Sequence, residues 1–122
     1  MPNSVYVVDD EQGIRDVISL ALKKTYHVKA FPSAETAIEA MNRDPPDLVL
    51  LDIGFPGMSG IEGLKQIKRL YPEMIVIMMS AHNDEKTVVY AMSLGAYDYL
   101  VKPLQIDILL EIVQSALWMN TK

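Results

Sequence analysis

The chain has 122 residues, half of them hydrophobic, which is enough for one domain with a sizeable core. It carries 11 basic and 16 acidic residues, for a net charge of −5, and no cysteine. These values exclude disulfides and thiolate metal sites, and they argue against direct nucleic-acid binding by this domain. No stretch approaches the ~18 apolar residues of a membrane span, and the first residues do not read as a signal peptide. We therefore expect one cytoplasmic domain over residues 1–122, alone or as the N-terminal part of a longer protein.

The chain opens with an apolar segment that ends on acids. Residues 4–9 (SVYVVD) are mainly β-branched or aromatic, which predicts a buried strand, and further carboxylates follow directly. A helix is expected over 11–25, where apolar side chains recur at helical spacing: Ile14, Val17, Ile18 and Leu22.

Strands and helices continue to alternate along the rest of the chain. Further strands are predicted over 27–31, 47–52, 74–80 and 97–102. Further helices are predicted over 33 to about 43, with Ser33 as the N-cap, and over 61–70, 84–95 and 108–119. Residues 53–60 hold three glycines and a proline, so they predict a loop.

This alternation predicts an α/β fold. Five strands and five helices favour a doubly wound, five-stranded parallel sheet with the flavodoxin-like order 2-1-3-4-5 and helices on both faces. In such folds functional groups lie at the carboxyl ends of the strands, near the switch point between the first and third strands.

Polar side chains stand at four of the predicted strand ends: Asp9 with Asp10, then Asp52, Ser80 and Lys102. Each pair of carboxylates at ~4 Å costs roughly 4 kcal/mol at an effective dielectric constant of ~20. The three acids can coexist by protonation, by pairing with Lys102 or by binding a cation. Oxygen ligands alone favour Mg²⁺, with Mn²⁺ as a second choice.

A carboxylate beside a divalent ion, an ammonium and a hydroxyl is suited to phosphoryl transfer, because the cations and the hydroxyl can bind the phosphoryl oxygens. Each residue taken alone has a simpler interpretation. Asp10 could cap the first helix, Ser80 could form a local hydrogen bond, and Lys102 could be a solvated surface residue. It is their occurrence together that favours the functional interpretation.

Four segments resemble the receiver domain of two-component response regulators, the group that includes the bacterial chemotaxis regulator. The resemblance covers nearly the whole chain. The segments are VVDDE at 7–11, LVLLD at 48–52 followed by PGMSG at 56–60, MMSAH at 78–82, and GAYDYLVKP at 95–103.

The resemblance implies an acceptor and a metal site. Asp52 matches the residue that accepts the phosphoryl group from the phosphohistidine of a histidine kinase. Asp10 matches a direct Mg²⁺ ligand, Asp9 a ligand partly through water, and the backbone carbonyl of Gly54 a third protein ligand beside Asp52. The implied activity is phosphotransfer and self-dephosphorylation rather than turnover catalysis.

The resemblance also implies a switch. Lys102 matches the lysine that binds the phosphoryl oxygens, and Ser80 the hydroxyl that moves toward them. Ala81 matches the small residue that leaves access to the site. Tyr99 matches the aromatic side chain that swings inward, and Pro103 implies a cis bond after Lys102.

Two positions depart from the family's pattern. Gly54 stands where a larger side chain is common, and Ser59 where an acid or amide often stands. Gly54 leaves the acyl phosphate less shielded from water, so hydrolysis could be governed mainly by His82, although His82 could equally be a solvated loop residue. His27 is expected on an edge strand without a role.

The last helix predicts a contact surface. Leu109, Val113, Ala116 and Leu117 form an inward stripe, whereas Ile106, Ile108, Ile112 and Met119 are expected largely off it, and Tyr90 outward on the preceding helix. Exposed aliphatic clusters often mark interfaces, so a homodimer or an effector partner is expected on the face of the fourth helix, fifth strand and fifth helix.

Three other functions are alternatives to this interpretation. A haloacid-dehalogenase-like Mg²⁺-dependent phosphatase would have an acid where Gly54 stands. A flavodoxin-like flavin carrier would have a hydroxyl- and glycine-rich loop where this chain has DDEQ. A pseudo-receiver that is never phosphorylated would lack one of the phosphorylation positions.

Overall fold

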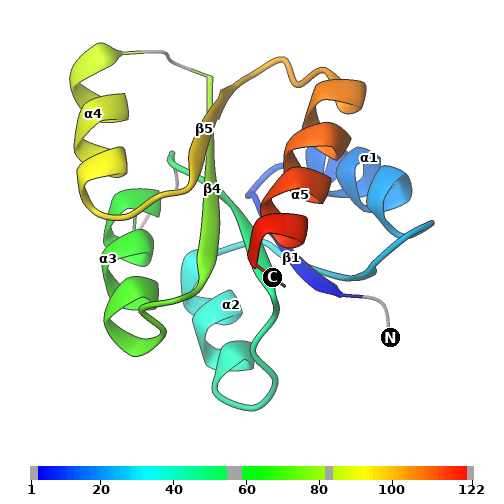
Figure 1. The fold of residues 1–122 in the computed structure, drawn as a ribbon, viewed down its shortest axis with the longest axis horizontal. Helices are drawn as coiled ribbons and strands as arrows, with labels where there is room; N and C mark the ends of the chain where they lie inside the picture. Colours follow the sequence, from blue (N-terminus) through cyan, green and yellow to red (C-terminus); the bar gives the residue numbers. More distant parts are fainter. Residues whose placement is uncertain (1–2, 55–58, 82–83, 121–122) are drawn as a thin grey trace.

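The computed structural model describes residues 3–54, 59–81 and 84–120 (Figure 1). Five strands and five helices alternate along the chain. The strands are β1 (Ser4–Val8), β2 (His27–Phe31), β3 (Leu48–Asp52), β4 (Ile75–Ser80) and β5 (Asp98–Val101). The helices are α1 (Gln12–Leu22), α2 (Ala34–Met41), α3 (Gly60–Leu70), α4 (Glu85–Ser93) and α5 (Ile106–Asn120).

The strands form one parallel sheet in the order β2-β1-β3-β4-β5, as predicted. The chain passes from β1 to β2 on one side and then crosses to β3 on the other side of β1. The carboxyl ends of β1 and β3 are therefore the switch point of the sheet. In the register Val8 lies opposite Leu51, so the residues that follow these two are brought side by side.

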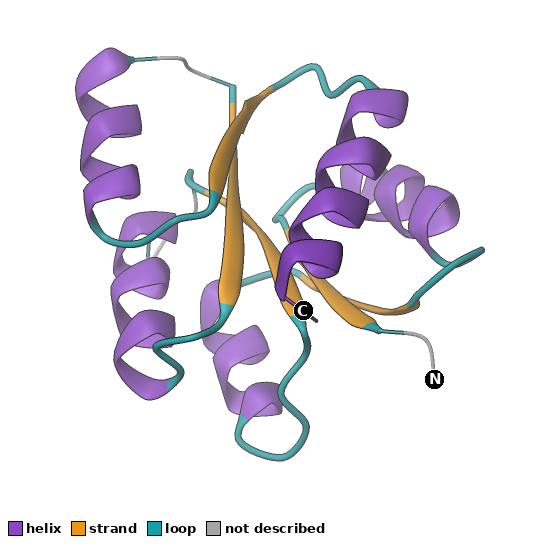
Figure 2. Ribbon diagram, in the orientation of Figure 1, coloured by secondary structure: helices purple, strands orange, loops and turns teal. Residues whose placement is uncertain are grey.

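Helices cover both faces of the sheet. Figure 2 shows α1 and α5 on one face and α2, α3 and α4 on the other. Side chains alternate between the two cores along each strand: in β1, Val5 and Val7 pack under α1 and α5, whereas Tyr6 and Val8 pack under the other three helices. Because both faces are covered, the central strands are continuously apolar rather than alternating, apart from the end residues Ser4, Asp52 and Ser80.

The first helix differs from its prediction. It ends at Leu22 rather than at residue 25, and Val17, one of the apolar residues at helical spacing, is 54% exposed. Ile14, Ile18 and Leu22 recur every four residues and form the face toward the sheet. Val17 lies about 100° around the helix from Ile18, so it falls at the edge of this face and remains exposed.

Two helices begin at serine caps. Ser33 caps α2 by accepting a 3.2 Å hydrogen bond from the backbone N–H of Thr36, as predicted. Ser59 caps α3 in the same way through Glu62, also at 3.2 Å. Serine at position 59, where the family often has an acid or amide, therefore has a structural role as a helix cap.

The last helix is only partly as expected. Its inward stripe is buried as predicted, and Ile108 and Met119 are exposed. Ile106 and Ile112 are half-buried against the core, so their expected place off the stripe was wrong. His27 is exposed on edge strand β2, as predicted. Among the described residues, no helix combines the length and apolar character that crossing a bilayer requires.

Candidate phosphoacceptor site

The predicted site residues converge at the carboxyl edge of the sheet. Asp52 is the last residue of β3 and Ser80 the last of β4, while Asp9 and Lys102 immediately follow β1 and β5. The backbone N–H of Lys102 donates a 2.7 Å hydrogen bond to the carbonyl of Ser80, so the sheet ladder itself fixes where the lysine begins.

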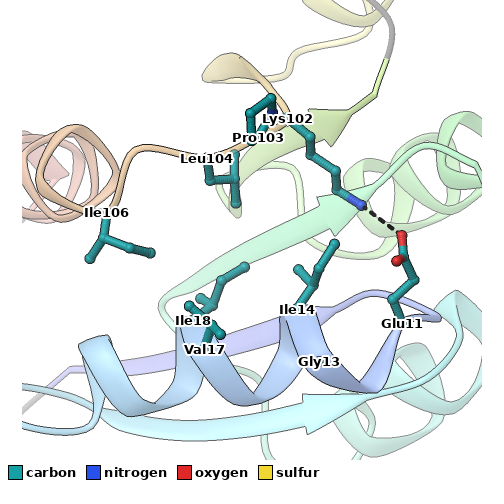
Figure 3. A pocket seen from close by; sticks show the side chains of 9 residues that line it. All are labelled: Glu11, Gly13, Ile14, Val17, Ile18, Lys102, Pro103, Leu104 and Ile106. Atoms are coloured by element: carbon teal, nitrogen blue, oxygen red, sulfur yellow. Dashed lines mark ion pairs between the residues drawn. The ribbon is translucent and has the colours of Figure 1, made fainter.

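The ammonium of Lys102 links the acids of this edge. Its Nζ lies 2.8 Å from Asp9 Oδ2 and 3.3 Å from Asp52 Oδ1. A third carboxylate, that of Glu11, approaches to 3.9 Å from the solvent side (Figure 3). With its side chain only 11% exposed, Lys102 is not the solvated surface residue that we considered as an alternative.

Burial and the charge of the partner shift the pKa values of Asp52 and Lys102 in opposite directions. Burial raises the pKa of Asp52, the nearby charge of Asp9 raises it further, and Lys102 lowers it without cancelling the rise. Burial lowers the pKa of Lys102, but the hydrogen bond to Asp9 and the charges of Asp52 and Asp9 outweigh it, so the net pKa is raised. The lysine is thus firmly charged, and the Asp52 carboxylate is less well solvated than an ordinary aspartate.

Asp9 and Asp10 differ in their surroundings. Asp9 is completely buried, and its Oδ1 accepts a 2.9 Å hydrogen bond from the backbone N–H of Glu11. Asp10 is exposed. It is not the helix cap, because α1 has Glu11 at its N-cap position and no side-chain capping hydrogen bond there. The capping interpretation of Asp10 was therefore wrong.

The three carboxylates form a cluster suited to a hard cation. One oxygen from each of Asp9, Asp10 and Asp52 lies within 4.8 Å of the other two. The donor set contains only oxygen, and two buried carboxylates share a single ammonium, so a divalent ion would relieve the remaining repulsion. The residues therefore fit Mg²⁺. Gly54 is exposed beside them, with open space where a side chain would stand.

The residues expected to form the switch lie on β4 and β5 or just after these strands. Ser80 is buried, Ala81 is exposed, and Tyr99 is half-buried against the core beneath α2, α3 and α4. The peptide bond between Lys102 and Pro103 is cis, in agreement with the family's pattern. His82 and residues 55–58 lie outside the described residues, so the hypothesis about His82 stays a prediction.

A cavity of about 370 Å³ adjoins the site on the α1 side. Figure 3 shows it between α1 and the segment that follows β5. Its walls are mostly apolar, and Glu11 and Lys102 stand at the end nearest the acids. The cavity and the acidic site therefore share Lys102.

A family model, the response regulator receiver domain, matches residues 5–114. The chain belongs to this family. The receiver domain is 41% identical over 115 residues to the DNA-binding transcriptional regulator NtrC of Proteus hauseri, a match that covers 93% of this chain and 24% of the relative. It therefore spans about a quarter of the length of such curated relatives.

Solved structures show the same architecture. A CheY-like receiver domain protein from Methanospirillum hungatei superposes with a TM-score of 0.95 at 27% identity, over 99% of this chain and 98% of that one. The "BeF3 Activated DrrB Receiver Domain" gives a TM-score of 0.88 at 32% identity, over 94% and 97%. Membership in the receiver family sets aside the dehalogenase-like and flavodoxin-like alternatives.

Two residues near the site were not singled out for it by sequence reasoning. Glu11 was noted only as an acid, yet it faces Lys102. Arg15 was overlooked, although its Nη1 donates a 2.8 Å hydrogen bond to the backbone carbonyl of Asp9. The only available signal was a basic residue one helical turn after the acidic segment.

Proposed function

We propose that this receiver domain is a phosphorylation-dependent switch and that Asp52 accepts the phosphoryl group. The observation that carries the proposal is the position of Asp52, which is 5% exposed, beside one ammonium and two further carboxylates. Burial and the negative charge of Asp9 leave its carboxylate poorly stabilised, which favours attack on phosphorus.

The chain's own residues have distinct parts in the proposed transfer. An Asp52 oxygen bonds to phosphorus while the bond from phosphorus to the donor's imidazole nitrogen breaks and the imidazole leaves with its electron pair. The ammonium of Lys102 and the hydroxyl of Ser80 then bind phosphoryl oxygens. Asp9, Asp10, Asp52 and the carbonyl of Gly54 would hold Mg²⁺, which supplies positive charge against the phosphoryl oxygens.

The response to the new charge is proposed to pass through Ser80 and Tyr99 to α4, β5 and α5. Ser80 moves toward the phosphoryl group, Tyr99 turns inward beside the small Ala81, and the surface between α4 and α5 changes. Water later hydrolyses the acyl phosphate. The phosphodonor is proposed to be a histidine kinase or phosphotransfer protein in the cytoplasm.

The downstream partner is proposed to be an effector domain. The curated relatives are named as DNA-binding regulators and are about four times as long as this chain. Residues 1–122 would then be the receiver part of a longer regulator, with nucleic-acid binding outside this domain. A homodimer contact is proposed on the face of α4, β5 and α5, and the exposed apolar residues Tyr90, Val101 and Ile108 support it.

The test is phosphoryl uptake from acetyl phosphate with MgCl₂, followed by intact-protein mass spectrometry. We expect the parent to gain one phosphoryl group, Asp52→Asn to gain none, and EDTA to suppress the reaction. Asp16→Asn, an exposed acid on α1, is the matched control. Equal labelling of Asp52→Asn would overturn the proposal. Failure of the parent to accept from acetyl phosphate and from histidine kinases would favour a pseudo-receiver.

A further inference from the structure

Every polar atom of Asp9 has a partner in the protein. Its backbone N–H donates to the carbonyl of Phe31 at 3.1 Å, and its two carboxylate oxygens accept from the Glu11 N–H and from Lys102. The remaining atom, the carbonyl oxygen, accepts the 2.8 Å hydrogen bond from Arg15 Nη1. Asp9 is thus fixed in both its backbone and its side chain, as a completely buried carboxylate requires.

The turn between β1 and α1 is held by an arginine rather than by a side-chain helix cap. The N-cap of α1 has no side-chain hydrogen bond, so the helix start is not fixed by the usual serine, threonine or aspartate cap. Instead the guanidinium of Arg15, one turn into α1, reaches back to the residue that ends the strand. The backbone N–H of Arg15 also donates to the carbonyl of Glu11 at 3.1 Å.

Asp10 lies between Asp9 and Glu11, whose backbones are both held by hydrogen bonds. It is exposed, yet one of its carboxylate oxygens comes within 4.8 Å of those of Asp9 and Asp52. Three negative charges at this separation repel one another. If the backbone turn between β1 and α1 were not held, this repulsion would move the Asp10 carboxylate away from Asp9 and Asp52. Contacts on its two neighbours oppose that movement, and Arg15 supplies one of them.

We propose that Arg15 is a positioning residue for the divalent-ion site, acting through the carbonyl of Asp9. The inference rests on the proposed Mg²⁺ site. Within the described part of the chain, Arg15 forms no ion pair with the three carboxylates, and its proposed effect passes through the backbone that carries Asp9 and Asp10. Removal of a hydrogen-bond partner of a metal-ligating side chain typically weakens metal affinity by about 10- to 100-fold, which sets the scale for this effect.

Because Arg15 is charged, the direction of the change in Mg²⁺ affinity after its substitution tests the proposal. A positive charge near three carboxylates weakens the binding of a cation, so removing that charge alone would tighten Mg²⁺ binding. Loss of the hydrogen bond to Asp9 would have the opposite effect, because Asp10 would no longer be held near Asp9 and Asp52. Positioning therefore predicts weaker binding after a substitution that electrostatics alone predicts to strengthen it.

The experiment titrates the protein with MgCl₂ and follows backbone amide chemical shifts. It compares the parent, Arg15→Met, Arg15→Lys and Lys23→Met, an equal charge change at the other end of α1. Circular dichroism checks that each protein is folded at the temperature used. We expect the Mg²⁺ dissociation constant to rise roughly tenfold in Arg15→Met. Arg15→Lys, which keeps the charge and an N–H donor, should lie closer to the parent, and Lys23→Met should not weaken binding.

The outcomes separate this inference from the proposed function. Parent binding with an unchanged or tighter dissociation constant in Arg15→Met would overturn the positioning role alone. Absence of saturable Mg²⁺ binding by the parent would overturn the ion site, and the positioning role with it. Should Arg15→Met not fold, Arg15→Leu removes the same charge and the same N–H donors, and tighter binding by that variant would equally contradict the proposal.

Discussion

The ammonium of Lys102 lies 2.8 Å from an oxygen of Asp9, a carboxylate with no exposed surface, although the two residues are 93 positions apart in sequence. The same ammonium lies 3.3 Å from Asp52. It is therefore both the main counter-charge of the site and a group that can bind phosphoryl oxygens. A residue with both roles links the stability of the fold to the chemistry of the site.

Removing this ammonium should destabilise the protein. Lys102→Met leaves Asp9 buried and without its charge partner, so the free energy of unfolding should fall by about 3 kcal/mol in urea denaturation with EDTA. Added MgCl₂ should restore part of the loss, since a cation at the cluster replaces the missing charge. The control is Lys29→Met, whose pair with Asp44 is exposed and should contribute less than about 1 kcal/mol. Equal losses of unfolding free energy in Lys102→Met and Lys29→Met would contradict the role of Lys102 as the counter-charge of a buried carboxylate.

The charge of Asp52 should make the apoprotein less stable at neutral pH. Its pKa is raised above 3.8 in the folded state by burial and by Asp9, so the folded protein holds this proton more tightly than the unfolded chain. Stability contributed by the protonated form is present below pH 3.8 and is lost as the pH rises through the raised folded-state pKa.

Asp52→Asn abolishes this titration. In EDTA it should therefore be more stable than the parent near pH 7, and the difference should shrink as the pH falls toward 4. Thermal unfolding at a series of pH values measures both proteins. Asp16→Asn, on the exposed side of α1, serves as the charge-matched control. If the parent were more stable than Asp52→Asn at pH 7 in EDTA, the Asp52 charge would stabilise the apoprotein, and the prediction would be wrong.

Gly60 should be required for the position of Asp52. A methyl group at Gly60, the first residue of α3, would overlap the backbone carbonyl oxygen of Asp52 and the Cα of Ile53. Gly60→Ala should therefore cost about 2 kcal/mol of stability, and it should slow phosphorylation by acetyl phosphate because the end of β3 must shift.

The matched control for Gly60 is Gly13→Ala. A methyl group at Gly13, within α1, would meet nothing within 4 Å, so this variant should gain about 0.5 kcal/mol. Chemical denaturation of the two alanine variants gives the comparison. The interpretation fails if Gly60→Ala is as stable as the parent and is phosphorylated as quickly.

The proposed homodimer contact should respond to the phosphoryl state. We expect sedimentation analysis to show association of the parent with Mg²⁺ and beryllofluoride and less association without them. Ile108→Asp, on exposed α5 surface, should weaken the dimer by about tenfold, the loss expected for one buried apolar anchor. Leu20→Asp introduces the same charge at a similarly exposed residue of α1 and should have no such effect. A parent that remains monomeric with the phosphoryl analogue would exclude this contact.

The sequence by itself determined the alternation of strands and helices, the sheet order and the acids at the strand ends. Apolar strands bounded by breakers, right-handed crossovers and the period of each helix are local or general constraints, and they left few topologies open. Because parallel strands end at one edge, the meeting of Asp9, Asp52, Ser80 and Lys102 also followed from the topology.

Only the tertiary structure decided what each of these residues contacts. Asp9 and Asp10 are neighbours in sequence, yet one is completely buried and the other exposed, because a single turn sends their side chains to different surroundings. Val17 fits the helical period but faces solvent, since α1 buries one narrow face against the sheet. The residue pattern shows only that a basic residue stands one turn after the acids. The hydrogen bond from Arg15 to the Asp9 carbonyl depends on how α1 leaves β1, and that geometry is set by packing rather than by periodicity.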